Sequence, residues 1–119
     1  MTHAIVLFGH GSRDPVWRKP IEAVADRLRT TSPDIAIRCA YLELMAPDLP
    51  AVAGELAASG IATVRVVPMF LGVGRHARED LPHIVDALRV QYPGVDFELA
   101  PAVGEDARLL DLLAAIALG

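Results

Sequence analysis

The chain of 119 residues has a single cysteine, Cys39, and a single lysine, Lys19. One cysteine excludes a disulfide within the chain and a metal site built from cysteines. Because Cys39 falls in an apolar segment, we expect a buried and unreactive thiol there. Aromatic residues make up only 5% of the chain, which argues against a surface that stacks nucleic-acid bases.

Basic and long apolar segments are also missing. The net charge is −4 and no block of lysine and arginine occurs, so the basic face of a phosphate-backbone binder is not predicted. No apolar run reaches about 18 residues without a charge or a proline, so we expect no membrane span. The first residues lack the basic region and cleavage pattern of a secretory leader. We therefore expect a cytoplasmic protein that binds neither nucleic acid nor membranes.

Strand and helix patterns alternate four times along residues 1–119, which predicts one α/β domain. The expected fold is a three-layer sandwich, with a four-stranded parallel sheet in the order 2-1-3-4 and helices on both faces. The expected strands span residues 4–9, 35–41, 62–68 and 95–99. The expected helices span 16–30, 48–59, from about 78–80 to 92, and 105–118. The last helix is apolar nearly all the way round, which fits either a wide buried face or one side packed on the sheet and another on a second subunit.

Two histidines follow apolar strands in glycine-bearing loops. His10 lies in Gly9-His10-Gly11-Ser12-Arg13-Asp14-Pro15, and His76 ends the segment Gly72-Val73-Gly74-Arg75-His76. Imidazole binds borderline transition metals and moves protons near neutral pH. A single loop histidine is more often a surface or capping residue, but two loops that deliver the same residue type indicate one shared site.

The expected strand order places these two loops together. Strand-to-helix loops of a parallel sheet leave at its carboxyl edge, and in the order 2-1-3-4 strands 1 and 3 are neighbours at the point where winding reverses. Open α/β sheets bind their ligands in the crevice at that point. His3 and His83 are not expected at this edge of the sheet.

Further side chains are expected at the same edge. Glu43 follows the second strand and could be a loop-stabilising acid, a proton acceptor or an auxiliary metal ligand. Three arginines, Arg13, Arg75 and Arg78, would suit a ligand rich in carboxylates, although loop arginines are often merely solvated. An apolar wall could come from Met45, Phe70 and Leu71, which could equally belong to the core.

Other motif interpretations are weaker. The third glycine of a dinucleotide fingerprint is missing after Gly72-Val73-Gly74, and no phosphate-binding loop with a lysine is present. Ser12 lacks the setting of a hydrolase nucleophile. Phosphohistidine chemistry at His10 stays open as an alternative, but the arginine that precedes the histidine in such phosphatases is replaced by Gly9.

The ordered motifs resemble those of a known family. The motifs are, in order, Gly-His-Gly-Ser-Arg-Asp-Pro, then Tyr-Leu-Glu-Leu with a later Pro, then Val-Pro-Met-Phe-Leu with a later His and Asp-Leu-Pro. This ordered set resembles that of the class II tetrapyrrole chelatases, and most of all that of the short sirohydrochlorin chelatases of the CbiX/SirB type. The resemblance spans about residues 4–117. It implies a lyase that inserts Co²⁺ or Fe²⁺ into sirohydrochlorin, for cobalamin or sirohaem synthesis, and that acts as a homodimer without an organic cofactor.

The resemblance also implies roles for individual residues. His10 and His76 would be metal ligands and catalytic groups, with Glu43 as the associated acid. The substrate would be bound by Gly11, Ser12, Arg13, Met45, Phe70, Leu71, Gly74, Arg75 and Arg78. A carrier of metal or tetrapyrrole without turnover, and a nickel chelatase for a related tetrapyrrole, remain alternatives.

Overall fold

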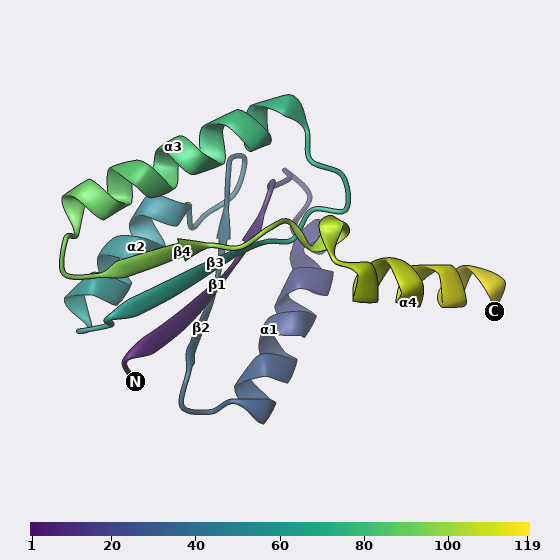
Figure 1. Cartoon of the computed structure of the whole chain (residues 1–119), viewed down its shortest axis with the longest axis horizontal. Helices are drawn as coiled ribbons and strands as arrows, with labels where there is room; N and C mark the ends of the chain where they lie inside the picture. The colour runs from purple at the N-terminus through teal and green to yellow at the C-terminus, as the bar shows by residue number, and fades with distance from the viewer.

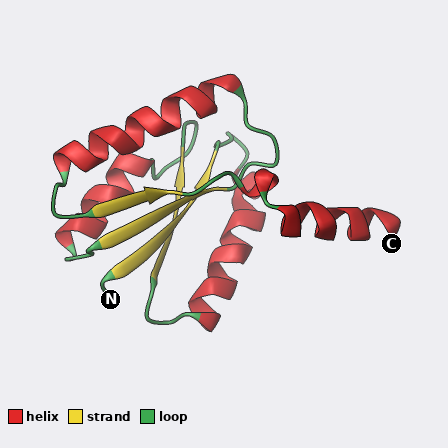
Figure 2. Cartoon of the chain, in the orientation of Figure 1, coloured by secondary structure: helices red, strands yellow, loops and turns green.

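A computed structural model describes residues 1–119 of the chain as a parallel sheet flanked by helices (Figure 1). The strands are β1 (His3–Gly9), β2 (Ala36–Tyr41), β3 (Thr63–Pro68) and β4 (Asp96–Leu99), in the order β2-β1-β3-β4. The helices are α1 (Lys19–Thr31), α2 (Leu49–Ala58), α3 (Arg75–Gln91) and α4 (Ala107–Leu118), with 3-10 turns η1 (Pro15–Arg18) and η2 (Val103–Glu105). The expected strand order and alternation of elements are confirmed, and Figure 2 shows the alternation along the chain.

The strand β1 is the centre of the sheet. It pairs in parallel with β2 on one side and with β3 on the other. Val6, Leu7 and Phe8 are buried, which requires cover on both faces of the strand because successive side chains point in opposite directions. A nearly continuous apolar sequence is what a strand in this position needs.

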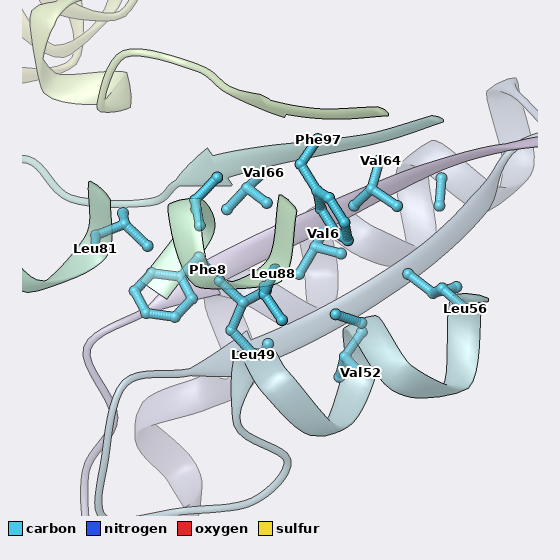
Figure 3. Packing of buried hydrophobic residues seen from close by; sticks show 14 of the residues in the cluster. Val6, Phe8, Leu49, Val52, Leu56, Val64, Val66, Leu81, Leu88 and Phe97 are labelled. Atoms are coloured by element: carbon cyan, nitrogen blue, oxygen red, sulfur yellow. The ribbon is translucent and has the colours of Figure 1, made fainter. Parts of the chain in front are cut away.

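The main core lies between the sheet and the helices α2 and α3. Val6 and Phe8 of β1 meet Val64 and Val66 of β3 in this layer, where Figure 3 shows their packing. The two helices contribute Leu49, Val52, Leu56, Ala77, Leu81, Val85 and Leu88. Phe8 also makes an edge-to-face contact with Phe70, with ring centroids 5.9 Å apart, an arrangement that aromatic pairs favour.

A smaller core covers the opposite face. Ile21 and Ala25 of α1 pack on Leu7, Ile37 and Tyr41 of the sheet. Only α1 packs on this face, and it contacts β1 and β2. The sheet is therefore covered unevenly, with one helix on this side and two on the other.

The start of α3 differs from the sequence expectation. The helix begins at Arg75, not near residues 78–80, so His76 lies in its first turn and not in a loop. Pro82 consequently sits inside the helix, where its missing N–H removes a backbone hydrogen bond. Burial of Ala77, Leu81 and Val85 along one side offsets that loss.

Three other expectations also need correction. Residues 15–18 form a 3-10 turn before α1, because Pro15 follows Asp14, whose side chain accepts from the Val16 N–H. Cys39 is only half-buried, since α1 does not cover it completely. None of the residues of α4 is buried, so it neither packs on the sheet nor forms a wide buried face. No helix is long and apolar enough to cross a bilayer.

Truncation of a valine should have opposite consequences on the two sides of α3. Val85 is fully buried, whereas Val90 is 82% exposed. We expect Val85→Ala to lower the free energy of unfolding by about 2 kcal/mol, because two methyl groups leave a close-packed site. Val90→Ala should leave it unchanged or raise it slightly, because alanine favours the helix. Urea unfolding followed by circular dichroism measures both, and equal losses would contradict the packing described here.

Candidate active site

The carboxyl ends of β1 and β3 lie side by side in the sheet. Phe8 of β1 pairs with Pro68 of β3, and the chain continues from these ends to His10 and to the segment 69–74. Chain winding reverses between these two strands, because β1 leads outward to β2 and β3 leads the other way to β4. The expected address of the site is therefore present in the fold.

His10 and Glu43 meet at this edge. The imidazole Nε2 of His10 lies 3.2 Å from the carboxylate Oε1 of Glu43, and about half of each side chain is exposed. The loops that carry them continue the pairing of β1 with β2, since the N–H of Leu42 donates to the carbonyl of Gly9 and the N–H of Glu43 donates to the carbonyl of His10. Backbone hydrogen bonds thus hold the acid beside the base.

Gly11 is required by this arrangement. Its φ of +102° lies in the region that disfavours side chains, and a Cβ atom there would overlap the backbone carbonyl of Glu43. Leu44, on the other side of Glu43, also has a positive φ, at 68°, which costs energy for a residue with a side chain. Glycine at position 11 therefore permits the close approach of the two loops, and the strain beside Glu43 is confined to Leu44.

His76 lies beyond the carboxyl end of β3. It is exposed in the first turn of α3, after Gly74, which stands at the N-cap. No three histidine, cysteine, aspartate or glutamate side chains gather closely enough to form a metal site. The structure brings His10 and Glu43 together, but it does not bring His76 to them as a third ligand.

The three arginines have different surroundings. Arg13 is exposed and makes no ion pair, whereas Arg75 pairs with Glu79 one turn further along α3. Arg78 lies at a cavity of about 170 Å³ between the start of α3 and the loop after β4. Arg75 and Arg78 also belong to the first turn of α3, whose free N–H groups and dipole favour anions.

The polar and glycine positions of the first loop have local structural roles. The hydroxyl of Ser12 accepts a hydrogen bond from the N–H of Asp14, and Asp14 in turn accepts from Val16. Gly9 gives room for neighbouring side chains, because a Cβ atom there would press on Ile21, Trp17 and Tyr41. These contacts fix the path of the chain on both sides of His10.

Only some of the apolar side chains expected at this edge are exposed. Leu71 is 64% exposed, as a wall residue would be, whereas Phe70 is buried in the core against Phe8 and Met45 is partly buried in the smaller core. The structure adds Leu44, Val16 and Trp17, which are also exposed. Leu44 adjoins Glu43 in sequence, so its position at this edge could have been predicted. The exposure of Trp17 could not, because it follows from the 3-10 turn that the sequence pattern did not predict.

A second missed residue supports the His76 side. The N–H of Gly104 in η2 donates to the carbonyl of Phe70, and a Cβ atom at Gly104 would overlap the backbone of Leu71. The segment that leads to His76 is therefore held against the turn after β4. No sequence signal near Gly104 indicates a contact with a residue more than thirty positions earlier.

Two weakly acidic groups lie near the end of β2. Burial raises the pKa of the Tyr41 phenol, and burial also raises the pKa of the Cys39 thiol. Both groups therefore stay neutral at physiological pH.

Comparison with known proteins identifies the family of this chain. The CbiX family model matches residues 4–117. The chain belongs to the CbiX family. The CbiX match includes all four strands and both His10 and His76, so the resemblance inferred from the ordered motifs is confirmed.

Individual relatives support the same assignment. A CbiX protein of cobalamin (vitamin B12) biosynthesis from Marinobacter aquaeolei VT8 has a similar structure, with a TM-score of 0.81, 33% identity, and coverage of 97% of this chain and 93% of that one. The sirohydrochlorin chelatase SirB from Bacillus subtilis subspecies spizizenii, solved with cobalt, has a TM-score of 0.79 and 23% identity, over 97% of this chain and 49% of that one. This second likeness is one of fold.

Among curated proteins, a sirohydrochlorin cobaltochelatase of Methanothermobacter thermautotrophicus is 36% identical over 81 residues, which are 68% of this chain and 56% of that protein. A second, from Methanopyrus kandleri, is matched over 57% of its length. The chain thus spans a little over half of the length of these two relatives.

Alanine substitution at two loop glycines should show whether Gly11 is specifically required or whether these loops accept a side chain at any glycine. We expect Gly11→Ala to destabilise the protein by about 1–3 kcal/mol, because the positive φ and the Glu43 carbonyl both oppose a side chain. Gly72 has open space around it, so Gly72→Ala should have little effect. Thermal unfolding of both variants is the measurement, and an unchanged Gly11→Ala protein would contradict the close approach of the two loops.

Proposed function

We propose that this chain is a chelatase domain that inserts a divalent metal, Co²⁺ or Fe²⁺, into sirohydrochlorin. The single observation that carries the proposal is the contact of His10 with Glu43 at the carboxyl edge of β1, beside the end of β3. The names of the curated relatives support this substrate and metal chemistry, since they are sirohydrochlorin cobaltochelatases. An alternative form of the same reaction uses Ni²⁺ and a related tetrapyrrole. The test below distinguishes it from insertion of Co²⁺ or Fe²⁺.

Proton removal is the first requirement of the reaction. The free tetrapyrrole loses two pyrrole N–H protons as the metal enters, and the electron pairs of those N–H bonds remain on the ring nitrogens. The imidazole of His10 accepts such a proton in its neutral form. The carboxylate of Glu43, 3.2 Å from Nε2, stabilises the resulting imidazolium, and exposure of both groups lets the proton pass on to water.

Release of the metal is the second requirement. The ion must leave its protein and water ligands for four ring nitrogens, so a closed set of protein ligands would oppose the transfer. His10 and Glu43 form no closed three-residue site with His76. Such an open arrangement suits a metal that is substrate and not a resident cofactor, and imidazole and carboxylate ligands accept cobalt, iron and nickel.

Substrate recognition needs both charge and apolar surface. Arg13, Arg75 and Arg78 and the free N–H groups of the first turn of α3 provide positive charge for the carboxylates of the tetrapyrrole. Leu44, Leu71 and Trp17 are exposed on the segments that follow β2, β3 and β1 and would give apolar contact for the flat ring. The ring would lie across the ends of β1 and β3, with its nitrogens toward His10.

The assembly and location of the protein form part of the same proposal. We propose a homodimer, because the SirB chain is about twice as long as the segment it shares with this one and a second copy would supply the missing unit. We also propose a cytoplasmic location, because the unpaired Cys39 suits a reducing compartment.

Removal of the imidazole at the site should abolish insertion. We expect His10→Ala to lower the rate with sirohydrochlorin and Co²⁺ at least about 100-fold, because the proton acceptor is lost. His76→Ala should also remove insertion above the protein-free rate. The measurement is an anaerobic absorbance time course with Co²⁺, Fe²⁺ and Ni²⁺ in turn. Each time course is followed until more than one equivalent of product per protein could have formed.

The matched control is His83→Ala, which removes an exposed imidazole further along α3 and should keep the wild-type rate. Product formation that stops at one equivalent in the wild type would indicate a carrier of metal or tetrapyrrole. A wild-type rate no higher than that of the protein-free control would overturn the catalytic proposal altogether.

Loss of one arginine should affect binding more than turnover. We expect Arg78→Gln to raise KM for sirohydrochlorin about tenfold with kcat nearly unchanged, because a charge-assisted hydrogen bond to a carboxylate is lost. Arg27→Gln, on the outer side of α1, should leave both constants as in the wild type. A fall in kcat without a change in KM would instead place Arg78 at the reacting centre.

A further inference from the structure

The sheet contains two similar units, because each inner strand leads through a helix to an outer strand. These units are β1–α1–β2 and β3–α3–β4, and their helices lie on opposite faces of the sheet (Figure 1). Arg29 at the end of α1 donates to the carbonyl of Ile37 in β2, and Arg89 at the end of α3 donates to the carbonyl of Phe97 in β4. Both contacts span eight residues, so Arg29 and Arg89 correspond to each other.

Aromatic side chains fill the carboxyl end of the first unit. Gly9 is the last residue of β1, and a Cβ atom there would press on Ile21, Trp17 and Tyr41. The rings of Trp17 and Tyr41 meet edge to face, with centroids 6.1 Å apart. The space between the end of β1 and the start of the first helix is therefore closed.

The same place in the second unit is open. When Arg29 is matched with Arg89, Trp17 corresponds to Ala77 and Tyr41 corresponds to Pro101. Ala77, Pro101 and the last residue of β3, Pro68, all line the cavity of about 170 Å³. Small side chains thus leave empty the space that two aromatic rings fill in the first unit.

The charge beside the cavity also differs between the units. Arg18 pairs with Glu22 one turn further along the chain. In the second unit Arg78 corresponds to Arg18, but Pro82 stands in place of the acid, and both residues line the cavity. The acid on the cavity wall, Glu105, is engaged elsewhere, because its carboxylate accepts the backbone N–H at the N-cap of η2. The guanidinium of Arg78 is therefore free to bind an anion.

We propose that this cavity receives one short carboxylate arm of the tetrapyrrole. Its alkyl stem lies among the apolar walls and its carboxylate binds Arg78. Apolar walls with one guanidinium suit an aliphatic carboxylate, because the stem needs apolar contact and the head needs a charged donor. A water molecule takes about 30 Å³ in the liquid, so the cavity accepts an arm of about five non-hydrogen atoms and excludes the ring.

The position of the cavity connects it with the site. Phe70 and Val73 line it, and both belong to the segment that leads from β3 to His76. An arm held there fixes one edge of the ring relative to His76. That the arm belongs to a tetrapyrrole rests on the proposed function, whereas the affinity of the cavity for a carboxylate does not.

Free propionate tests the carboxylate chemistry without a ring or a metal. In ¹H–¹⁵N spectra of the protein, propionate should shift the amides of Ala77, Arg78 and Ala102 and saturate at a dissociation constant on the order of millimolar, as expected for so small a ligand. Propionamide, which has the same shape without the charge, should cause no such shifts, and Arg78→Gln should abolish those of propionate. Absence of saturable shifts in the wild type would refute the proposal.

Closing the cavity tests whether the arm belongs to the ring. We expect Ala77→Leu, or Pro101→Tyr if the first variant does not fold, to weaken binding of metal-free sirohydrochlorin about tenfold, because the arm loses its bond to Arg78. Ala87→Leu, the same change at an exposed position of α3, is the matched control and should bind as the wild type. An absorbance titration without metal measures the dissociation constants, so no turnover is needed.

The double variant Ala77→Leu with Arg78→Gln shows whether the two changes act on one arm. It should bind sirohydrochlorin no more weakly than either single variant, because residues that share one partner are not additive. Multiplied effects would place the arm elsewhere and contradict the proposal.

Two further outcomes separate this inference from the proposed function. Wild-type affinity in both single variants, with metal insertion by the wild type intact, would overturn the assignment of the cavity and leave the chelatase standing. Binding of propionate by a wild type that does not bind sirohydrochlorin would assign the cavity to a free carboxylate, and would overturn the arm together with the proposed function.

Discussion

The parallel pairing of β1 with both β2 and β3 is the constraint on which the rest of the structure depends. It buries Val6, Leu7 and Phe8 on two faces, and it brings the loops after three strands to one edge. The backbone hydrogen bonds that extend the β1–β2 ladder to Leu42 and Glu43 are a direct continuation of it. The acid beside His10 is therefore held by the same type of interaction as the sheet.

The segments that carry His10 and His76 are supported differently. On the His10 side, short-range geometry is decisive, because Gly11 must lack a side chain for the Glu43 loop to approach. On the His76 side, the segment 70–74 is held by the distant turn η2 through Gly104. His76 itself lies in the first turn of α3. The first side thus follows from neighbouring strands, and the second links the site to the region from which α4 departs.

The exposure of the site suits the proposed chemistry. A site that must take up a metal and a large ring, and then release the product, benefits from being open, and here it is formed by exposed side chains at a sheet edge. As a consequence, this chain of 119 residues encloses the site only a little.

The sequence by itself determined the four strands, their parallel order, the address of His10 and Glu43, and the family, because buried strands have apolar runs and the motifs are local. Tertiary structure alone decided what depends on distant contacts. Burial of Ala77, Leu81 and Val85 extends α3 back to Arg75 despite Pro82, and Phe70 enters the core through Phe8. Whether α4 packs on its own sheet could not be read from an apolar helix, because hydrophobicity has no direction and only the path set at Gly104 and Asp106 supplies one.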